Sequence, residues 1–197
     1  MPEDWDRSDR IPFPITPHPQ TPAADVLLAL SKYDDTLQLL RDASQRPVSR
    51  FPINYDAPGF SISLMHLSKL KVAAIYLHLL TAAQLESGQT EAAASNVNLM
   101  FCVADSVKTE PFLISYLVRA SILQINLSAV WEGMSKHRWS AEELKTFQEK
   151  LQSMDMLADY VMAMQGERSC DFRVIDDVTT RRLAMINSLG LLTDEEM

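Results

Sequence analysis

The sequence contains few of the residues that build metal and redox sites. It has 2 cysteines in 197 residues, Cys102 and Cys170, and they do not form a C-x-x-C pair. A redox motif or a zinc site built on paired cysteines is therefore excluded, and we expect neither a metal nor another cofactor. Cys102 lies in an apolar segment, where cysteine behaves as a small buried hydrophobic residue. A single disulfide between the two cysteines stays open.

Positive charge is also scarce. The chain has 18 Lys and Arg against 26 Asp and Glu, which gives a formal net charge of −8. Nucleic-acid-binding proteins carry basic patches or stripes, so this balance argues against a nucleic-acid partner. The sequence also lacks the G-x-S-x-G, H-E-x-x-H, P-loop, G-x-G-x-x-G and EF-hand patterns. We therefore assign no catalytic residue and expect a protein that is not an enzyme.

Glycine is rare too, with 5 in the chain, and no segment alternates polar and apolar residues as a strand does. Hydrophobic residues make up 47% of the chain and recur at helical spacing, which is enough for a buried core. These features predict an all-α array or bundle of about five to seven helices with helical-hairpin packing. We divide the chain into an extended Pro-rich arm over 1–22, a helical domain over 23–170, and a C-terminal tail over 171–197 that could hold a short helix.

Prolines gather at the N-terminus and in one later loop. Residues 1–22 hold 6 of the 10 prolines, so this arm is expected to be extended, as a linker or as a strap on the domain surface. A recruitment motif for an aromatic groove is the sharper alternative. Thr21 and Pro22 then fit the start of a first helix that runs to about Gln45. Residues 46–60 follow as an irregular, aromatic loop that would suit the lip of a ligand site.

Two helices with a short connection are predicted over 63–87 and 90–107. Gly88 suits the end of the first, and Ala93 would allow the two helices to cross closely. The pattern resembles a tetratricopeptide hairpin, but the helices are longer and no second copy follows at a period of about 34 residues. We expect one hairpin with repeat-like packing rather than a repeat array.

The most apolar stretch of the chain runs over 109–133, and Arg119 carries the one formal charge of its interior. Thr109 fits an N-cap and Gly133 fits a stop. On a helical wheel, two polar sectors alternate with two apolar faces, so this helix is predicted to lie sandwiched between neighbours. Polar residues interrupt the stretch, and a membrane span is not expected in this chain.

Arg119 is the sharpest site candidate. A guanidinium on a mostly apolar helix needs a partner, because burying an unpaired charge is very costly. The favoured interpretation is a structural ion pair, and Ser115 and Asn126 share its sector of the wheel. The carboxylates considered as partners are those of Asp105, Glu132 and Glu167. The alternative is an anion or carboxylate site in a cleft.

The candidate binding residues lie on the two most apolar predicted helices. They are Arg119, Tyr116, Asn126, His66, His78 and Trp131. The two histidines are about 120° apart on the wheel of one helix, so they do not form the i, i+4 pair of a two-histidine metal site. A neutral, hydrogen-bonded histidine is the usual outcome, and a ligand or general base is the alternative.

The strongest local signal follows the central helix, where Ser140 and Glu143 fit a capping box. A helix over 140–165 is therefore expected, either continuous or broken near Asp155, which could cap a second helix. Residues 166–177 are interpreted as a polar connector before a last short helix.

Several phrases occur in the same order in one uncharacterised bacterial family of the planctomycete and verrucomicrobial type. They are RPVSRFPINYD, HLSKLK, EPFLISYLVRASI, VWEGM, HRWSAEEL and GER. The chain resembles this family over residues 12–170. The resemblance implies a helical protein with a Pro-rich stretch and, in most members, a membrane anchor and further sequence after the last phrase. This chain shows no such anchor and ends at Met197, as a truncated member would. No activity is assigned to the family.

Together these features favour a non-enzymatic helical scaffold or protein-interaction module, which binds through apolar methionine and aromatic surface. The alternative is a small-molecule-binding helical protein or enzyme with a cleft around Arg119. Convergence of Arg119 with His66 or His78 on one concave pocket would decide between them. A protein partner is expected, whereas the oligomeric state is not determined. The location is either the bacterial cytoplasm or, with an upstream anchor, the envelope side.

Overall fold

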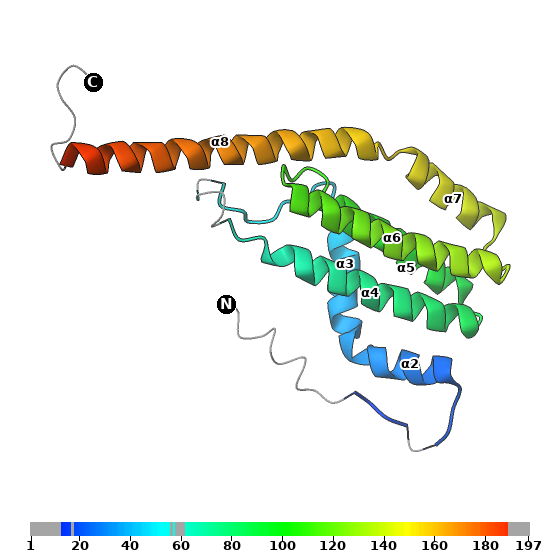
Figure 1. The fold of residues 1–197 in the computed structure, drawn as a ribbon. Helices are drawn as coiled ribbons and strands as arrows, with labels where there is room; N and C mark the ends of the chain where they lie inside the picture. The colour runs from blue at the N-terminus through cyan, green and yellow to red at the C-terminus, as the bar shows by residue number, and fades with distance from the viewer. Residues whose placement is uncertain (1–12, 17, 56, 58–61, 189–197) are drawn as a thin grey trace.

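The computed structural model of the protein describes residues 13–16, 18–55, 57 and 62–188. In this part of the chain there are helices and no strand, which confirms the predicted all-α class (Figure 1). The elements are α2 (Pro22–Leu30), the 3-10 turn η1 (Ser31–Tyr33), α3 (Asp34–Ser44), α4 (Met65–Glu86), α5 (Thr90–Asp105), α6 (Leu113–Ser135), α7 (Ala141–Gln152) and α8 (Met156–Ser188).

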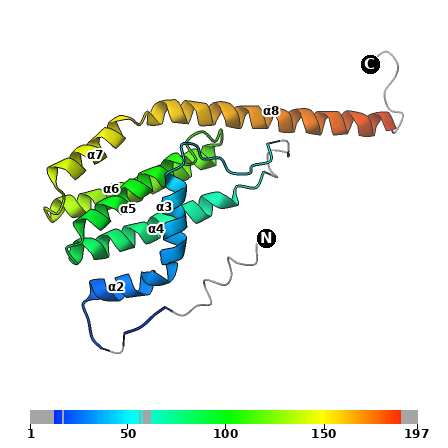
Figure 2. The ribbon, with the colours of Figure 1, turned by 180° about the vertical axis from the view of Figure 1, so that it is seen from behind.

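Helices α4, α5 and α6 form the centre of the bundle, and each packs against the other two. Helix α2 covers α4, and α8 covers α6 (Figures 1 and 2). The core between them is apolar and closed to solvent, as burial of this much hydrocarbon requires. Its fully buried members include Leu77, Leu85, Val97, Met100 and Ile122.

The first predicted helix is divided in two by η1. Its start is as expected, because the Thr21 side chain accepts a hydrogen bond from the Ala24 amide and Pro22 occupies the first turn. At the division Tyr33 is buried and its ring stacks on Tyr76 of α4. The turn lets α2 pack on α4 while α3 packs on α5. Most of the predicted arm over 1–22 lies outside the described residues, but Phe13 contacts Tyr33 edge-on.

The predicted hairpin is present as α4 and α5. Gly88 adopts a φ of 74°, the left-handed conformation that glycine tolerates best at a helix C-terminus. The Gln89 amide then donates to the Gln84 carbonyl at 2.8 Å and closes the turn. Ala93 is fully buried at the close approach of the two helices.

Helix α6 begins later than the sequence indicates. Its N-cap position is Phe112, and Leu113 is the first helical residue, so the predicted cap at Thr109 is wrong. The reason is tertiary: the carboxylate of Glu167, on α8, accepts a hydrogen bond from the Leu113 amide at 3.1 Å. A side chain 54 positions away therefore supplies the cap that a local residue was expected to provide.

The orientation of α6 also differs from the prediction. The polar sector of Ser115, Arg119 and Asn126 is fully buried, whereas some apolar side chains lie on the surface, so α6 lies between α4, α5 and α8 but is only partly enclosed by them. The exposed ones are Ile114, Leu117, Leu127, Trp131 and Met134. By length and composition α6 is the one described helix that could cross a membrane, with 39% of the relevant window buried, and core helices pass the same test.

Helix α7 starts at the predicted capping box, with the Ser140 and Glu143 side chains each bonding the other's backbone amide. Of the two alternatives for 140–165, the structure has the broken one, because the Asp155 carboxylate caps α8 through the Ala158 amide. The polar connector predicted over 166–177 is wrong, since α8 continues through it to Ser188. Consequently the boundary drawn at residue 171 lies inside a helix that extends past the end of the bundle (Figure 1).

Candidate functional site

Arg119 is the centre of a buried ion-pair cluster that joins three helices. Its side chain is 1% exposed, and its guanidinium donates to Asp105 of α5 at 2.9 Å and to Asp159 of α8 at 2.5 Å. The Met156 sulfur accepts a further contact at 3.2 Å. One buried guanidinium therefore has two carboxylate partners, a shielded one in Asp159 (11% exposed) and a solvent-accessible one in Asp105 (42% exposed).

This geometry matches the favoured interpretation of Arg119 as a structural ion pair. Asp105 was one of the expected partners, whereas Glu132 pairs with Lys136 and Glu167 caps α6. Asp159 was missed. The signal for it is its place between Met156 and Ala163, at helical spacing on the inward face of α8. The Nε atom of Arg119 is buried without a hydrogen-bond partner among the described residues.

The other candidates are dispersed over the molecule. Asn126 is buried and donates to the Val97 carbonyl at 3.2 Å. Tyr116 meets Tyr160 of α8 edge-on, and Trp131 is 70% exposed. On the surface His78 lies 3.9 Å from Glu132.

His66 belongs to a separate buried cluster. Its Nε2 lies 2.7 Å from Glu110 Oε1, and its ring stacks on Phe51 with centroids 4.2 Å apart. The second oxygen of Glu110 accepts a hydrogen bond from the Ser115 hydroxyl at 2.6 Å. The cluster therefore connects α4, the α5–α6 connection, α6 and the loop that precedes α4.

The order of groups in this cluster does not suit nucleophilic catalysis. A serine nucleophile needs the histidine as its immediate base, with the carboxylate behind the histidine. Here the carboxylate of Glu110 lies between Ser115 and His66, and Ser115 is fully buried. The arrangement holds the loop and helices in place rather than activating a hydroxyl.

The loop over 46–55 covers two adjoining hollows. The larger, which we call the loop groove, has a volume of about 560 Å³ and lies between this loop, α3, α4 and α5. Its wall is apolar at Leu40, Phe51, Leu70 and Leu99, and Arg46 and Arg50 are at its rim.

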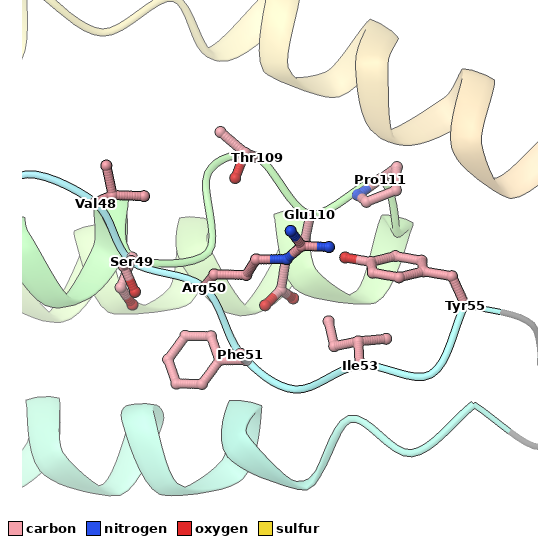
Figure 3. Close-up of a pocket in the computed structure, with 10 residues that line it drawn as sticks. Val48, Ser49, Arg50, Phe51, Ile53, Tyr55, Thr109, Glu110 and Pro111 are labelled. Atoms are coloured by element: carbon pink, nitrogen blue, oxygen red, sulfur yellow. The ribbon is translucent and has the colours of Figure 1, made fainter.

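The smaller hollow, about 350 Å³, lies between Arg50, Tyr55 and the segment Thr109–Pro111. In Figure 3 the side chains of Arg50 and Tyr55 both point toward the middle of this hollow. Arg46 and Arg50 are exposed and form no ion pair within the described part of the chain. Neither hollow is lined by Arg119, His66 or His78.

A stripe of exposed apolar side chains follows α8 along its whole length. On a wheel of about 100° per residue they share one side, whereas Asp159 and Ala163 face α6 from another. We call these residues the α8 stripe: Leu157, Tyr160, Val161, Met164, Phe172, Ile175, Val178 and Met185, which are 39–72% exposed. Exposed apolar side chains that recur on one side of a helix are typical of a binding face.

Other chemistry is limited in the described ranges. They contain no group of three or more His, Cys, Asp or Glu side chains that could hold a metal ion. Cys102 and Cys170 are both free thiols and half-buried. No family model, curated protein or solved structure matches this chain.

Proposed function

We propose that the protein is a non-enzymatic helical interaction module that presents α8 to a helical partner. The observation that carries this proposal is the α8 stripe, whose exposed apolar residues recur on one side of the helix from Leu157 to Met185. An amphipathic helix whose apolar face lacks a neighbour is suited to pack against another helix at i, i+3, i+4 and i+7 positions.

The anchoring of α8 supports the same role. Asp159 and Glu167 bond to α6, so the first part of the helix is held by the bundle. The second part extends beyond the bundle, where its stripe is accessible from the side (Figures 1 and 2). The resemblance to a bacterial family without assigned activity is compatible with a scaffold role.

Site-specific photo-cross-linking in a host cell tests this proposal. A photoreactive residue at Ile175, on the stripe, should give a cross-linked adduct, and one at Thr180, about 140° away on the wheel, should not. A second substitution, Val178→Asp, should abolish the adduct from position 175. Equal yields at 175 and 180, or no adduct at either, would contradict the proposal.

The loop groove favours ligand binding as a second candidate function. Its volume lies in the range of small-molecule sites, with an apolar wall and two arginines at the rim. An amphipathic carboxylate would place its chain on Leu70 and Leu99 and its head group at Arg46 and Arg50. This reading does not use Arg119, because Asp105 and Asp159 already satisfy its charge.

Calorimetric titration with dodecanoate tests this second candidate. Binding should be saturable in the wild-type protein and weakened by Arg46→Ala with Arg50→Ala, because both charges at the rim are lost. Arg138→Ala is the matched control, since Arg138 is exposed and distant in sequence from the groove lining. Equal affinities for the double variant and the control would exclude the groove as the site.

A further inference from the structure

We propose that the distal half of α8, from Arg168 to Ser188, pairs with the same segment of a second copy of this chain in an antiparallel arrangement. The inference rests on the proposed interaction role of α8 and names its partner. It is drawn from the apolar residues of this half together with two charges that lie among them.

The apolar part of this surface is substantial. Phe172, Ile175, Val178 and Met185 are 53–64% exposed. The contacts of α8 with α6 at Asp159, Tyr160 and Glu167 all lie in its first half, and in its second half Arg173 donates to the Tyr55 carbonyl from the opposite side of the helix to Ile175 and Val178. Over 21 residues at about 1.5 Å each, the segment offers a contact about 31 Å long.

Two charges of opposite sign lie within the stripe. Asp171 and Arg182 are eleven positions apart, which places them about 20° apart on the wheel and about 16 Å apart along the axis. Both are exposed, and neither forms an ion pair or hydrogen bond within the described residues. By contrast, Arg181 is already paired with Asp177 on the flank of the helix at 2.9 Å.

These positions are complementary to themselves under a twofold rotation. If the axis passes midway between Asp176 and Asp177, Asp171 of each copy faces Arg182 of the other, and Ile175 faces Val178. The same axis therefore satisfies the two charges and the Ile175–Val178 contact together. This property defines an isologous interface, in which each contact occurs twice. A parallel pair would instead place each charge beside its own kind, which costs energy.

Light scattering after size-exclusion chromatography, over a range of protein concentrations, tests the pairing. The wild-type chain should elute with twice the 22.2 kDa mass of one copy. Asp171→Arg alone and Arg182→Asp alone should each weaken the dimer by about tenfold or more, because each places like charges together twice. The double variant should restore the dimer, because the charges are then exchanged but still complementary.

Glu149→Arg on α7 is the control for charge reversal as such and should leave the dimer intact. Helix content should be similar in all variants, and so should the thermal midpoint at a concentration low enough to keep every variant monomeric, because every altered side chain is exposed. A monomeric wild-type chain at all concentrations, or a double variant that stays monomeric, would overturn the pairing. If cross-linking at Ile175 still captures a different protein in that case, the interaction role stands and only the identity of the partner fails.

Discussion

Helix α8 carries two aspartate–arginine ion pairs of the same chemistry in different surroundings. Asp159 pairs with Arg119 of α6, where the two side chains are 11% and 1% exposed. Asp177 pairs with Arg181, the residue four positions later on α8, and these two side chains are 41% and 71% exposed. The distances are similar, at 2.5 Å and 2.9 Å.

The two pairs differ in how well water can hydrate the aspartate when its arginine is removed. Water hydrates Asp177 if Arg181 is removed, so an exposed pair contributes little. If Arg119 is removed, water replaces it poorly at Asp159, which is 11% exposed, although water can still hydrate Asp105, which is 42% exposed. The comparison shows that burial, rather than distance, decides how much each pair contributes to stability. The Asp159–Arg119 pair also joins α8 to the bundle, whereas Asp177 and Arg181 both lie on α8.

The largest expected effect is therefore that of Arg119→Met. It should lower the free energy of unfolding by about 3–5 kcal/mol, because it leaves the shielded carboxylate of Asp159 without a counter-charge. Arg181→Met, the matched control, should cost about 0.3–0.5 kcal/mol. Urea unfolding of both variants at one fixed protein concentration measures this difference. Losses of equal size would show that the Arg119 cluster is hydrated.

Gly166→Val should have the next largest effect. A Cβ on Gly166 would lie 2.0 Å from the backbone oxygen of Pro111, at the crossing of α8 with the start of α6. Since a backbone atom cannot rotate away, α8 must shift, at a cost of about 1–3 kcal/mol. Ala184→Val in the exposed half of the same helix should cost only about 0.5 kcal/mol from helix propensity.

Hydrogen exchange provides the structural readout for Gly166→Val. The Leu113 amide, which donates to Glu167 one residue beyond the glycine, should exchange faster in this variant. Amides in the middle of α4 should keep their protection, because that helix does not contact α8. An unchanged Leu113 amide would mean that the crossing relaxes elsewhere.

Ser140→Ala gives the stability cost of losing a local interaction, for comparison with the tertiary contacts of Arg119 and Gly166. It removes the capping box with Glu143 and should cost about 1 kcal/mol. Ser153→Ala is its control, since that hydroxyl only bonds the Lys150 carbonyl within its own helix and is exposed. Thermal unfolding of both variants distinguishes a cap from an ordinary surface serine, and matching midpoints would contradict the capping role.

The smallest effect is expected at the surface pair of Glu86 and Lys136. The hydrogen bond and charge of Lys136 lower the pKa of Glu86, and the hydrogen bonds to Glu132 and Glu86 raise the pKa of Lys136. The pKa of Glu86 is lower in the folded state than in the unfolded state. Its contribution to the free energy of unfolding is therefore present above the unfolded-state pKa and is lost as the pH falls through the folded-state pKa. The pKa of Lys136 is raised in the folded state. Its contribution to the free energy of unfolding is therefore present below the unfolded-state pKa and is lost as the pH rises through the folded-state pKa.

Nuclear magnetic resonance titration of the Glu86 carboxyl checks this pair. Lys136→Met should raise the pKa of Glu86 toward its ordinary value, and added salt should do so in part, because an exposed pair is screened. A Glu86 pKa that is the same with and without Lys136 would show that the two side chains do not interact in solution.

Two glycines illustrate the limits of the local signals. Gly133 was interpreted as a helix stop and Gly166 as the first residue of a polar connector, yet α6 continues to Ser135 and α8 continues past Gly166. A Cβ on Gly133 would lie 2.1 Å from the Trp139 ring, so both glycines permit close approach inside helices. Gly88, by contrast, was predicted correctly, because its turn is closed by neighbours in sequence.

The sequence by itself determined the all-α class, the α4–α5 hairpin, the capping box at Ser140 and the need of Arg119 for a carboxylate. These depend on spacing and on interactions within a few positions of the chain. Only the tertiary structure decided that Asp159 completes the Arg119 cluster, that Glu167 caps α6, and that α8 presents an apolar stripe to solvent. Such outcomes depend on contacts between segments distant in the chain, and helical periodicity identifies a face without stating what it meets.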